Sequence, residues 1–450
     1  MTRAGLSGAR RPVGAGLGAA WLLIAIATYR VQPARAQSAP EAATNDTQAS
    51  QIHNPQVAPP GLGLSRWINP ATAPFIPVPV IGADPNSGTT LGILPTWVHT
   101  NEQGEISRII APDFTHNPDF GYGAHGRIFS YPSENEQWSV VAGLQERVQK
   151  VFDAEYATEL SRQNAWSINY SAVFNRDGTP RFFGIGNSTR LSDESNFTRS
   201  REFAQIQVGF NFSHEWQLLY TFRPERVDVT PGTLQSTPTI ASRFPDVLGL
   251  GVNELLLNRL SVVYDTRDNL IVPREGVQWV LYGGLASRSG IFNDSEYSEA
   301  GIDARSFWPL NSNTVLAAHA SLRYLPSTNR IPFWALSNIG GDADVIGGEQ
   351  ALRGFGEGRF YDRDAFTSTL ELRRKVLSFQ AATTRVDVEF TPFIELGRVF
   401  AQASTLPFTQ LHKVAGIGFR GVARPFIVGY VDFGYGGEGL AAFTGINYPF

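Results

Sequence analysis

The sequence predicts an all-β protein, a transmembrane antiparallel β-barrel of 16 strands with a long extracellular loop folded into its lumen. Much of the chain is divided into segments of about ten residues that alternate apolar and polar side chains between polar turns, as barrel strands do. Beyond the N-terminal region, no stretch reaches the roughly 20 apolar residues of a membrane helix. A closed barrel crosses a membrane without helices because it pairs every backbone group inside the lipid.

Composition excludes several classes of function. The chain has 450 residues, a net charge of −4 and no cysteine. A chain without a basic field does not attract nucleic acid, so we expect no nucleic-acid partner. The absence of cysteine excludes a disulfide scaffold and a thiolate metal site, and we expect neither a metal nor a cofactor.

The first 36 residues are predicted to be a signal peptide. Arginines at positions 3, 10 and 11 precede an apolar run from Val13 to Tyr29, and Ala34-Arg35-Ala36 supplies small residues for cleavage. The mature chain is then expected to begin at Gln37. The alternative is a membrane anchor, for which the run is short and rich in glycine.

Residues 37–86 are predicted to form a Pro-rich periplasmic linker or plug, followed by the barrel over residues 87–450. An independent domain usually needs 50 residues or more and a core of its own, which this segment does not offer. The apolar end of the segment, Phe75–Ile81, is expected to pack against the barrel or to plug its mouth.

Seventeen segments of the barrel region have the pattern of strands. A barrel made from one bacterial chain has an even number of strands, so we expect 16, with one early segment folded as a loop. The segments are Thr89–His99, Ile106–Phe114, Phe120–Tyr131, Gln137–Val148, Val151–Leu160, Trp166–Phe174, Phe203–Phe212, Glu215–Phe222, Leu257–Tyr264, Val277–Leu285, Tyr297–Phe307, Thr314–Tyr324, Phe366–Val376, Thr384–Phe400, Leu411–Val422, Pro425–Gly434 and Leu440–Phe450.

The alternation is regular in the last third of the chain. In Thr384–Phe400, residues such as Val388 and Ile394 share one face, and Glu389 and Glu395 share the other. Apolar side chains of a membrane barrel face lipid and polar ones face the lumen. Glu371, on the preceding strand, is predicted to face the lumen as well.

The last predicted strand ends on an aromatic residue. Leu440, Tyr448 and Phe450 fall on one face of that strand. Tyr448 and Phe450 resemble the C-terminal signal of bacterial outer-membrane barrels. Pro449 has no N–H to donate to a ladder, so we expect a weak seam between the first and last strands there.

The segment from Pro326 to Asp364 is too long and too rich in glycine for a hairpin turn. At its centre, Gly347-Gly348-Glu349-Gln350-Ala351-Leu352-Arg353-Gly354-Phe355-Gly356 places Arg353 between glycines, which allow close approach of the backbone. We expect this loop to fold back into the barrel with Arg353 as its anchor.

Three motifs together resemble the bacterial surface antigen family of outer-membrane barrels, which includes assembly factors of the BamA/TamA type and two-partner secretion transporters. Tyr264-Asp265-Thr266-Arg267-Asp268-Asn269 resembles the family's strand–turn–strand signature. Leu352-Arg353-Gly354-Phe355 resembles the Arg-Gly-aromatic tip of its long sixth extracellular loop. Phe393-Ile394-Glu395-Leu396-Gly397 resembles the strand motif that receives the loop arginine, with Glu395 where the family usually has Asp. Phe182-Phe183-Gly184-Ile185-Gly186-Asn187 is also reminiscent of the family.

The resemblance implies two sites and a location in the bacterial outer membrane. The loop–lumen anchor would consist of Arg353, Gly354, Phe355, Glu395, Glu371, Phe393 and Gly397. In the turn motif, Asp265, Arg267 and Asp268 are expected to cap and cross-link a turn. Family members that insert or secrete proteins carry POTRA domains ahead of the barrel. Residues 37–86 are too few for one, so we expect a member without POTRA domains.

We therefore expect a conduit for the assembly or translocation of protein or lipid, with an unknown cargo. The expected partners are outer-membrane lipids and lipopolysaccharide, and the barrel-assembly machinery during insertion. One alternative is a passive pore or a structural surface barrel. A barrel hydrolase is a third possibility, but none of the seven histidines lies in a nucleophile elbow or a His-Glu-x-x-His run. We expect no enzyme and no catalytic residues.

Overall fold

The computed structural model describes residues 75–100, 106–133, 135–147, 149–234, 236–288, 296–326, 330–341, 352–381, 384–402, 408–423, 427–446, 448 and 450. All of them belong to one compact unit, Leu62–Phe450. The predicted signal peptide and residues 37–74 of the predicted linker lie outside the described residues, and so do Gly347–Ala351 of the loop.

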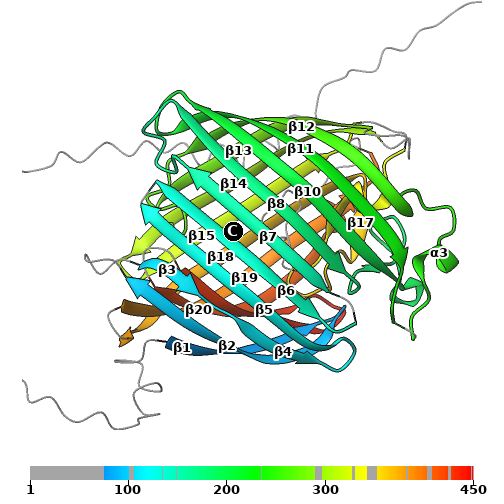
Figure 1. The fold of residues 1–450 in the computed structure, drawn as a ribbon, viewed down its shortest axis with the longest axis horizontal. Helices are drawn as coiled ribbons and strands as arrows, with labels where there is room; N and C mark the ends of the chain where they lie inside the picture. Colours follow the sequence, from blue (N-terminus) through cyan, green and yellow to red (C-terminus); the bar gives the residue numbers. More distant parts are fainter. Residues whose placement is uncertain are drawn as a thin grey trace, which may run out of the picture. The chain divides into compact units, whose positions relative to one another are not determined.

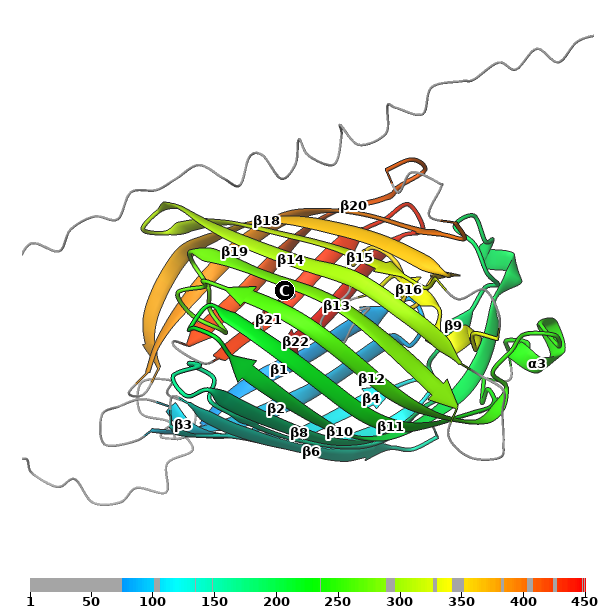
Figure 2. The same cartoon turned by 90° about the horizontal axis from the view of Figure 1, so that it is seen from above.

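The described strands form a closed antiparallel barrel of 18 strands. The strands cross the barrel obliquely, and the short helix α3 lies beyond the strand ends (Figures 1 and 2). β3 and β4 are two halves of one strand, because both pair with β2 and β5. The strands of the barrel are β1 (Phe75–Asp84), β2 (Gly88–Thr100), β3 (Ile106–Ile110), β4 (Asp113–Asn117), β5 (Gly121–Ser133), β6 (Glu136–Gln145), β7 (Lys150–Thr158), β8 (Trp166–Asp177), β10 (Ser195–Asn211), β11 (Trp216–Pro231), β12 (Gly251–Asp265), β13 (Gly276–Arg288), β14 (Tyr297–Asn311), β15 (Thr314–Tyr324), β18 (Asp364–Ala381), β19 (Thr384–Phe400), β20 (His412–Ala423), β21 (Ile427–Tyr435) and β22 (Leu440–Ile446).

Short elements occupy three of the connections. β9 (Arg181–Phe182) and η2 (Leu191–Asp193) lie between β8 and β10, and α3 (Ile240–Arg243) lies between β11 and β12. The long segment between β15 and β18 contains η3 (Phe333–Ala335) and a two-stranded sheet made of β16 (Ser337–Ile339) and β17 (Phe360–Asp362).

The predicted number of 16 strands is wrong, because no early segment folds as a loop. All seventeen predicted segments overlap strands of the barrel, and the eighteenth strand is β1. The first described strand of the barrel, β1, lies within residues 37–86, the segment predicted to form the linker or plug.

Two prolines in β1, Pro77 and Pro79, hid this strand from the sequence analysis. Proline is tolerated in a strand that has a poorly paired edge. β1 pairs with β2 along its whole length, but the described residues of β1 and β22 share one register pair, Ala83 with Ala442. The prolines thus belong to a strand at the seam of the barrel.

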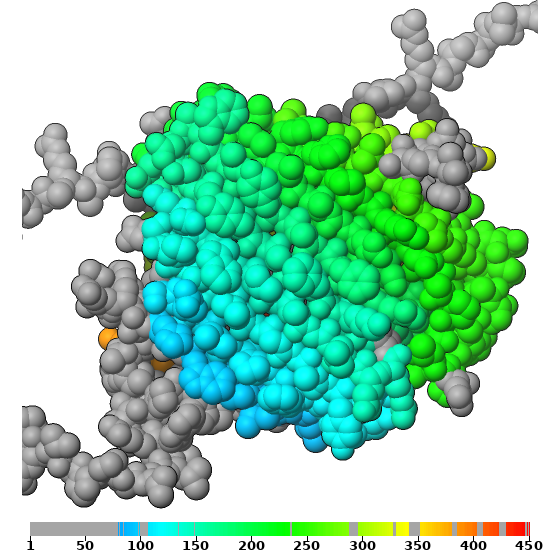
Figure 3. Space-filling model, in the orientation of Figure 1, coloured from blue at the N-terminus to red at the C-terminus, as the bar shows by residue number. Residues whose placement is uncertain are grey.

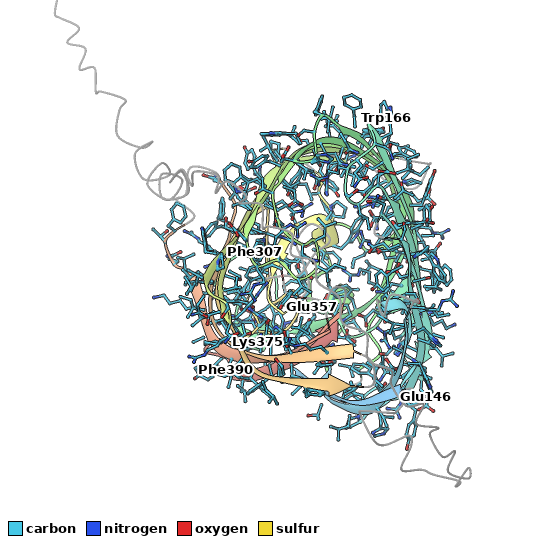
Figure 4. The ribbon with its side chains drawn as sticks, turned by 90° about the vertical axis from the view of Figure 1, so that its left-hand side faces the viewer. Glu146, Trp166, Phe307, Glu357, Lys375 and Phe390 are labelled. Atoms are coloured by element: carbon cyan, nitrogen blue, oxygen red, sulfur yellow. The ribbon has the colours of Figure 1, made fainter. Side chains whose placement is uncertain are left out.

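The wall has an apolar outer face and a polar inner face, as the alternation predicts. In β19, Glu389, Phe393 and Glu395 are buried, whereas Ile394 between them is 53% exposed. Trp166 points away from the ring of strands, and Glu357 lies inside it (Figure 4). The strands from β5 to β12 present a continuous outer face in Figure 3. Among the described residues, no helix has both the length and the apolar character needed to span a membrane.

The last strand is shorter than predicted. β22 ends at Ile446, and Tyr448 and Phe450 are each 7% exposed, so they do not continue the outer face on which Leu440 lies. A proline cannot donate to the ladder, which is a physical reason for the strand to stop before Pro449. Pro449 itself lies outside the described residues.

Candidate functional site

The segment between β16 and β17 presents Arg353 to the inner faces of three strands. The Arg353 side chain donates to Glu371 on β18 (Nη2 to Oε1, 2.8 Å), to Glu395 on β19 (Nε to Oε1, 2.7 Å) and to Asp432 on β21. Its guanidinium also stacks on Phe393, 3.7 Å from the ring centroid. Arg353 is 0% exposed, so three carboxylates and one aromatic face replace its water.

Glu395 binds the backbone of the segment as well as the arginine. Its Oε2 accepts from the N–H groups of Leu352 (2.8 Å) and Arg353 (2.6 Å). Leu352 has a positive φ of 89°, which is uncommon for a residue other than glycine. The carboxylate thus holds a strained turn in place at the same time as it pairs the guanidinium.

Two further arginines balance the acids. Arg420 on β20 donates to both oxygens of Asp432 and, at 3.4 Å, to Glu371. Arg373 donates from Nε to Oε2 of Glu371 at 3.0 Å. The site therefore holds three arginines and three carboxylates, all of them buried, which suits a dry interior where an unpaired charge is costly.

Charge balance also sets the protonation of the loop arginine. Burial lowers the pKa of Arg353, but the nearby carboxylates of Glu395, Asp432 and Glu371 outweigh this and raise its pKa well above its usual value. Arg353 therefore stays positively charged at every physiological pH.

Glycines give the segment its close approach to β19, β21 and the turn that follows β21. A Cβ at Gly354 would overlap the backbone of Gly436, and a Cβ at Gly434 would overlap the carbonyl of Arg353. Gly397 faces Leu352, whose side chain would lie 3.0 Å from an added Cβ. These positions have no room for a larger residue.

Phe355 completes the apolar part of the site. It lies with Leu352, Phe360 and Phe393 in one buried cluster, and its ring meets Phe360 edge-on with centroids 5.3 Å apart. This apolar cluster lies beside the three arginines and three carboxylates, on the side where the segment lies. All seven residues predicted for the loop–lumen anchor are therefore in this region of the structure.

Sequence reasoning missed Asp432, Arg420 and Arg373. Alternation in the strand predicted at Pro425–Gly434 could have identified Asp432 as an inward acid. Nothing in the local pattern distinguishes Arg420 or Arg373 from other inward polar residues, because their role depends on where Arg353 enters.

A second connection packs on the same segment. Ile185 and Gly186, which follow β9, bridge to Tyr361, and the N–H of Gly186 donates to the Tyr361 carbonyl at 2.6 Å. Phe182 meets the Tyr361 ring edge-on at 5.3 Å and the Phe333 ring at 5.0 Å. The reminiscent Phe182–Asn187 motif is therefore a packing surface for the segment that carries Arg353.

Arg359 links this packing to the turn between β21 and β22. It forms an ion pair with Glu438 (Nη2 to Oε1, 2.8 Å) and donates to Thr189 (Nη1 to Oγ1, 2.9 Å). Its guanidinium lies 4.2 Å from the ring centroid of Phe183. Three connections far apart in the sequence thus meet at one arginine.

The turn motif lies between β12 and β13. Arg267 forms a two-pronged pair with Asp265, at 2.9 and 2.8 Å, and Gln278 Nε2 donates to Asp265 Oδ2 at 2.9 Å. Asp268 Oδ1 accepts from the N–H of Arg274 at 2.8 Å. These contacts tie the end of β12 to the start of β13.

Tyr448 and Phe450 lie against the inner wall. The Tyr448 hydroxyl donates to Glu389 Oε2 at 2.8 Å, and Arg373 Nη2 donates to the main-chain oxygen of Phe450 at 3.1 Å. The Phe450 ring stacks on His319, with centroids 5.3 Å apart. Within the described part of the chain, no group of three or more His, Asp or Glu residues is arranged to hold a metal ion.

Comparison with known proteins identifies a family. The family model of the Omp85 superfamily domain matches residues 134–424. BamA from Haemophilus ducreyi lacking POTRA domains 1–3 has 14% identity and a TM-score of 0.48, with 83% of this chain and 75% of that chain covered. CdiB from Escherichia coli has 12% identity and a TM-score of 0.46, with 82% of this chain and 61% of that chain covered. The chain thus spans less than two thirds of that CdiB, and no curated protein matches it.

Proposed function

The chain belongs to the Omp85 superfamily of outer-membrane barrels, and we propose that it serves as a conduit for the assembly or translocation of protein or lipid. We propose further that the long segment between β15 and β18 is an extracellular loop that closes the lumen. The observation that supports both proposals is the burial of Arg353 among Glu371, Glu395 and Asp432.

An arginine held in this way can fasten a loop and also release it. Each bond of the guanidinium ends on a strand of the wall, so the loop is held by side-chain contacts at its tip. Separating an ion pair in a dry site is costly, but water that enters an opening lumen would solvate both partners. A closed and an open state would then differ by the release of the Arg353 side chain from its acids and of two backbone N–H groups from Glu395.

The conductance of the purified protein in planar lipid bilayers tests this proposal. The parent barrel should conduct weakly, and a variant that lacks residues 340–360 should conduct strongly because nothing fills the lumen. Arg353→Ala should show frequent openings of intermediate size. Arg190→Ala is the matched control, because Arg190 is an exposed arginine on the connection between β8 and β10 and pairs with Asp193 at 3.3 Å.

A passive pore or structural surface barrel is the alternative, and the same experiment separates it. If the parent conducts as strongly as the variant without residues 340–360, the loop does not close the lumen. Export of protein or lipid in a strain that lacks the gene tests the conduit itself. A normal outer membrane and normal export in that strain would count against assembly or translocation.

A hydrolase has less support among the described residues. His319 Nε2 contacts Asp303 Oδ2 at 2.6 Å, an arrangement found in catalytic dyads. However, the other Asp303 oxygen pairs with Arg305 at 3.0 Å, and the His319 ring is stacked on Phe450. The histidine is therefore engaged in packing the inner wall. A hydrolase would require an activity that is lost when one residue is changed.

A further inference from the structure

Tyr448 and Phe450, the aromatic pair, leave the sheet and lie on the inner wall of the barrel. The last register pair between β21 and β22 joins Gly429 to Ile446, so the ladder ends before the pair. Both side chains are buried. The Phe450 ring lies in one cluster with Phe307, Val315 and Ala317, which belong to β14 and β15.

The wall supplies a hydrogen-bond partner for the Tyr448 hydroxyl and another for the main-chain oxygen of Phe450. Glu389 accepts a hydrogen bond from the Tyr448 hydroxyl, and Arg373 donates to the main-chain oxygen of Phe450. The same Arg373 guanidinium lies 3.9 Å from the Tyr448 ring centroid and 4.9 Å from that of Phe450. Arginine over aromatic faces and a hydrogen-bonded phenol are directional contacts, which loose hydrophobic burial alone would not supply.

One carboxylate connects this site to the loop arginine. Glu371 accepts from Arg353 at Oε1 (2.8 Å) and from Arg373 at Oε2 (3.0 Å). Its two oxygens thus orient the arginine that holds the loop and the arginine that holds the aromatic pair. Glu395, in contrast, contacts Arg353 and not Arg373 in the bonds that the structure shows.

We propose that the inner wall formed by Phe307, His319, Arg373 and Glu389 is a binding site for the chain's own aromatic pair, which obstructs the lumen as a second, releasable closure. The first closure is the loop, and Glu371 supports both. The binding of the aromatic pair to the inner wall does not depend on the proposed function. The claim that it obstructs the lumen rests on that function.

A cysteine placed under the pair can report its release, because the chain has no cysteine of its own. Ala317→Cys puts a small thiol in the cluster that Phe450 covers, and Ala317 is buried. The rate of reaction with a water-soluble maleimide is then measured on the folded barrel in detergent. Folding of every variant is checked by its heat-dependent shift in gel mobility.

In this background, Phe450→Ala should raise the reaction rate about tenfold, which corresponds to the loss of one cation–π contact and one stacked ring. Tyr448→Phe keeps both rings and should give a smaller rise through the lost bond to Glu389. Glu371→Gln should raise the rate because Arg373 loses its orienting partner. Equal rates in the parent, Phe450→Ala and Glu371→Gln would overturn the proposed site.

The matched control is Glu395→Gln, which removes a buried charge from Arg353 but not from the wall under the pair. It should leave the maleimide rate unchanged, and a rise equal to that of Glu371→Gln would show general loosening instead of a shared support. In bilayers, Phe450→Ala added to the variant that lacks residues 340–360 should increase conductance further. If it does not, while the maleimide rates follow the expectation, the pair is seated but does not obstruct the lumen.

Discussion

Two parts of the inner wall carry similar side chains in different surroundings. On β18, β19 and β21, the inward acids Glu371, Glu395 and Asp432 are fully buried and each pairs with arginine. On β7 and β8, the inward Asp153 and Asn169 are partly exposed as whole residues, but each has one buried side-chain oxygen without a hydrogen-bond partner among the described residues. The strands on the two sides alternate in the same way.

The difference comes from the connections rather than from the strands. The segment with Arg353 bonds to β18, β19 and β21, and the packing of its neighbours excludes water there. The side-chain bonds of Arg353 end on β18, β19 and β21, and not on β7 or β8. A polar inner face can thus carry paired or unpaired polar groups, and the segment with Arg353 decides where the acids are paired.

Arg353→Ala should have the largest effect on this contrast. It leaves three buried carboxylates with less positive charge, so we expect a loss of about 3–5 kcal/mol in the free energy of unfolding. Urea unfolding in detergent measures the loss, and limited proteolysis measures release of the loop. A variant with the parent's urea midpoint and protease resistance would show that the stability of this buried ion-pair site does not depend on Arg353.

Glu395→Asp should have the next largest effect on the free energy of unfolding. The shorter side chain restores the residue usual in the family but cannot reach both the guanidinium and the two N–H groups that Glu395 now binds. Losing one bond to a charged group is expected to cost about 1.5–3 kcal/mol. A gain in the urea midpoint would mean that the segment moves to meet an Asp without penalty. Ser321→Ala, elsewhere on the inner wall, serves as a control for general loosening.

Gly434→Ala tests the close approach of the segment to β21. The added Cβ would overlap the Arg353 carbonyl, which is backbone and cannot turn away. Overpacking of this kind costs about 1–3 kcal/mol in unfolding free energy. Gly429→Ala is the control on the same strand, because nothing lies within 4 Å of a Cβ there. Equal urea midpoints for the two variants would contradict the close approach.

Asp153→Asn on β7 should have the smallest effect. Asn keeps the size of the side chain, and Asp153 has no arginine partner in the described structure, so the change in unfolding free energy should stay within about 0.5 kcal/mol. The same urea measurement applies. A loss as large as that of Glu395→Asp would mean that the unpaired Asp153 contributes as much to stability as the paired acids, and the comparison between the two walls would fail.

The strands could be predicted because each one carries its own signal. Alternation with period two identified seventeen of them, since a wall between lipid and lumen requires it at every position. β1 was missed because Pro77 and Pro79 resemble a linker, and only its pairing with β2 shows that it is a strand. Strand ends were also imprecise, as the early end of β22 shows.

The candidate site could be predicted only in part. Arg353 and Glu395 belong to motifs that can be read locally, and Glu371 follows from alternation. Asp432, Arg420 and Arg373 join the site because three strands happen to face one arginine tip, a long-range arrangement that no local pattern contains. The position of Tyr448 and Phe450 on the inner wall also depends on long-range contacts that no local pattern contains.

The sequence by itself determined the class of the fold, the inner and outer faces of the wall and the arginine at the tip of the long segment. These depend on periodicity and on residue type, which are local properties. Only the tertiary structure decided which acids surround Arg353, which inward polar groups are paired and where the last two aromatic residues lie. Each of these depends on which side chains are brought together across the barrel, and that depends on the closure of all its strands.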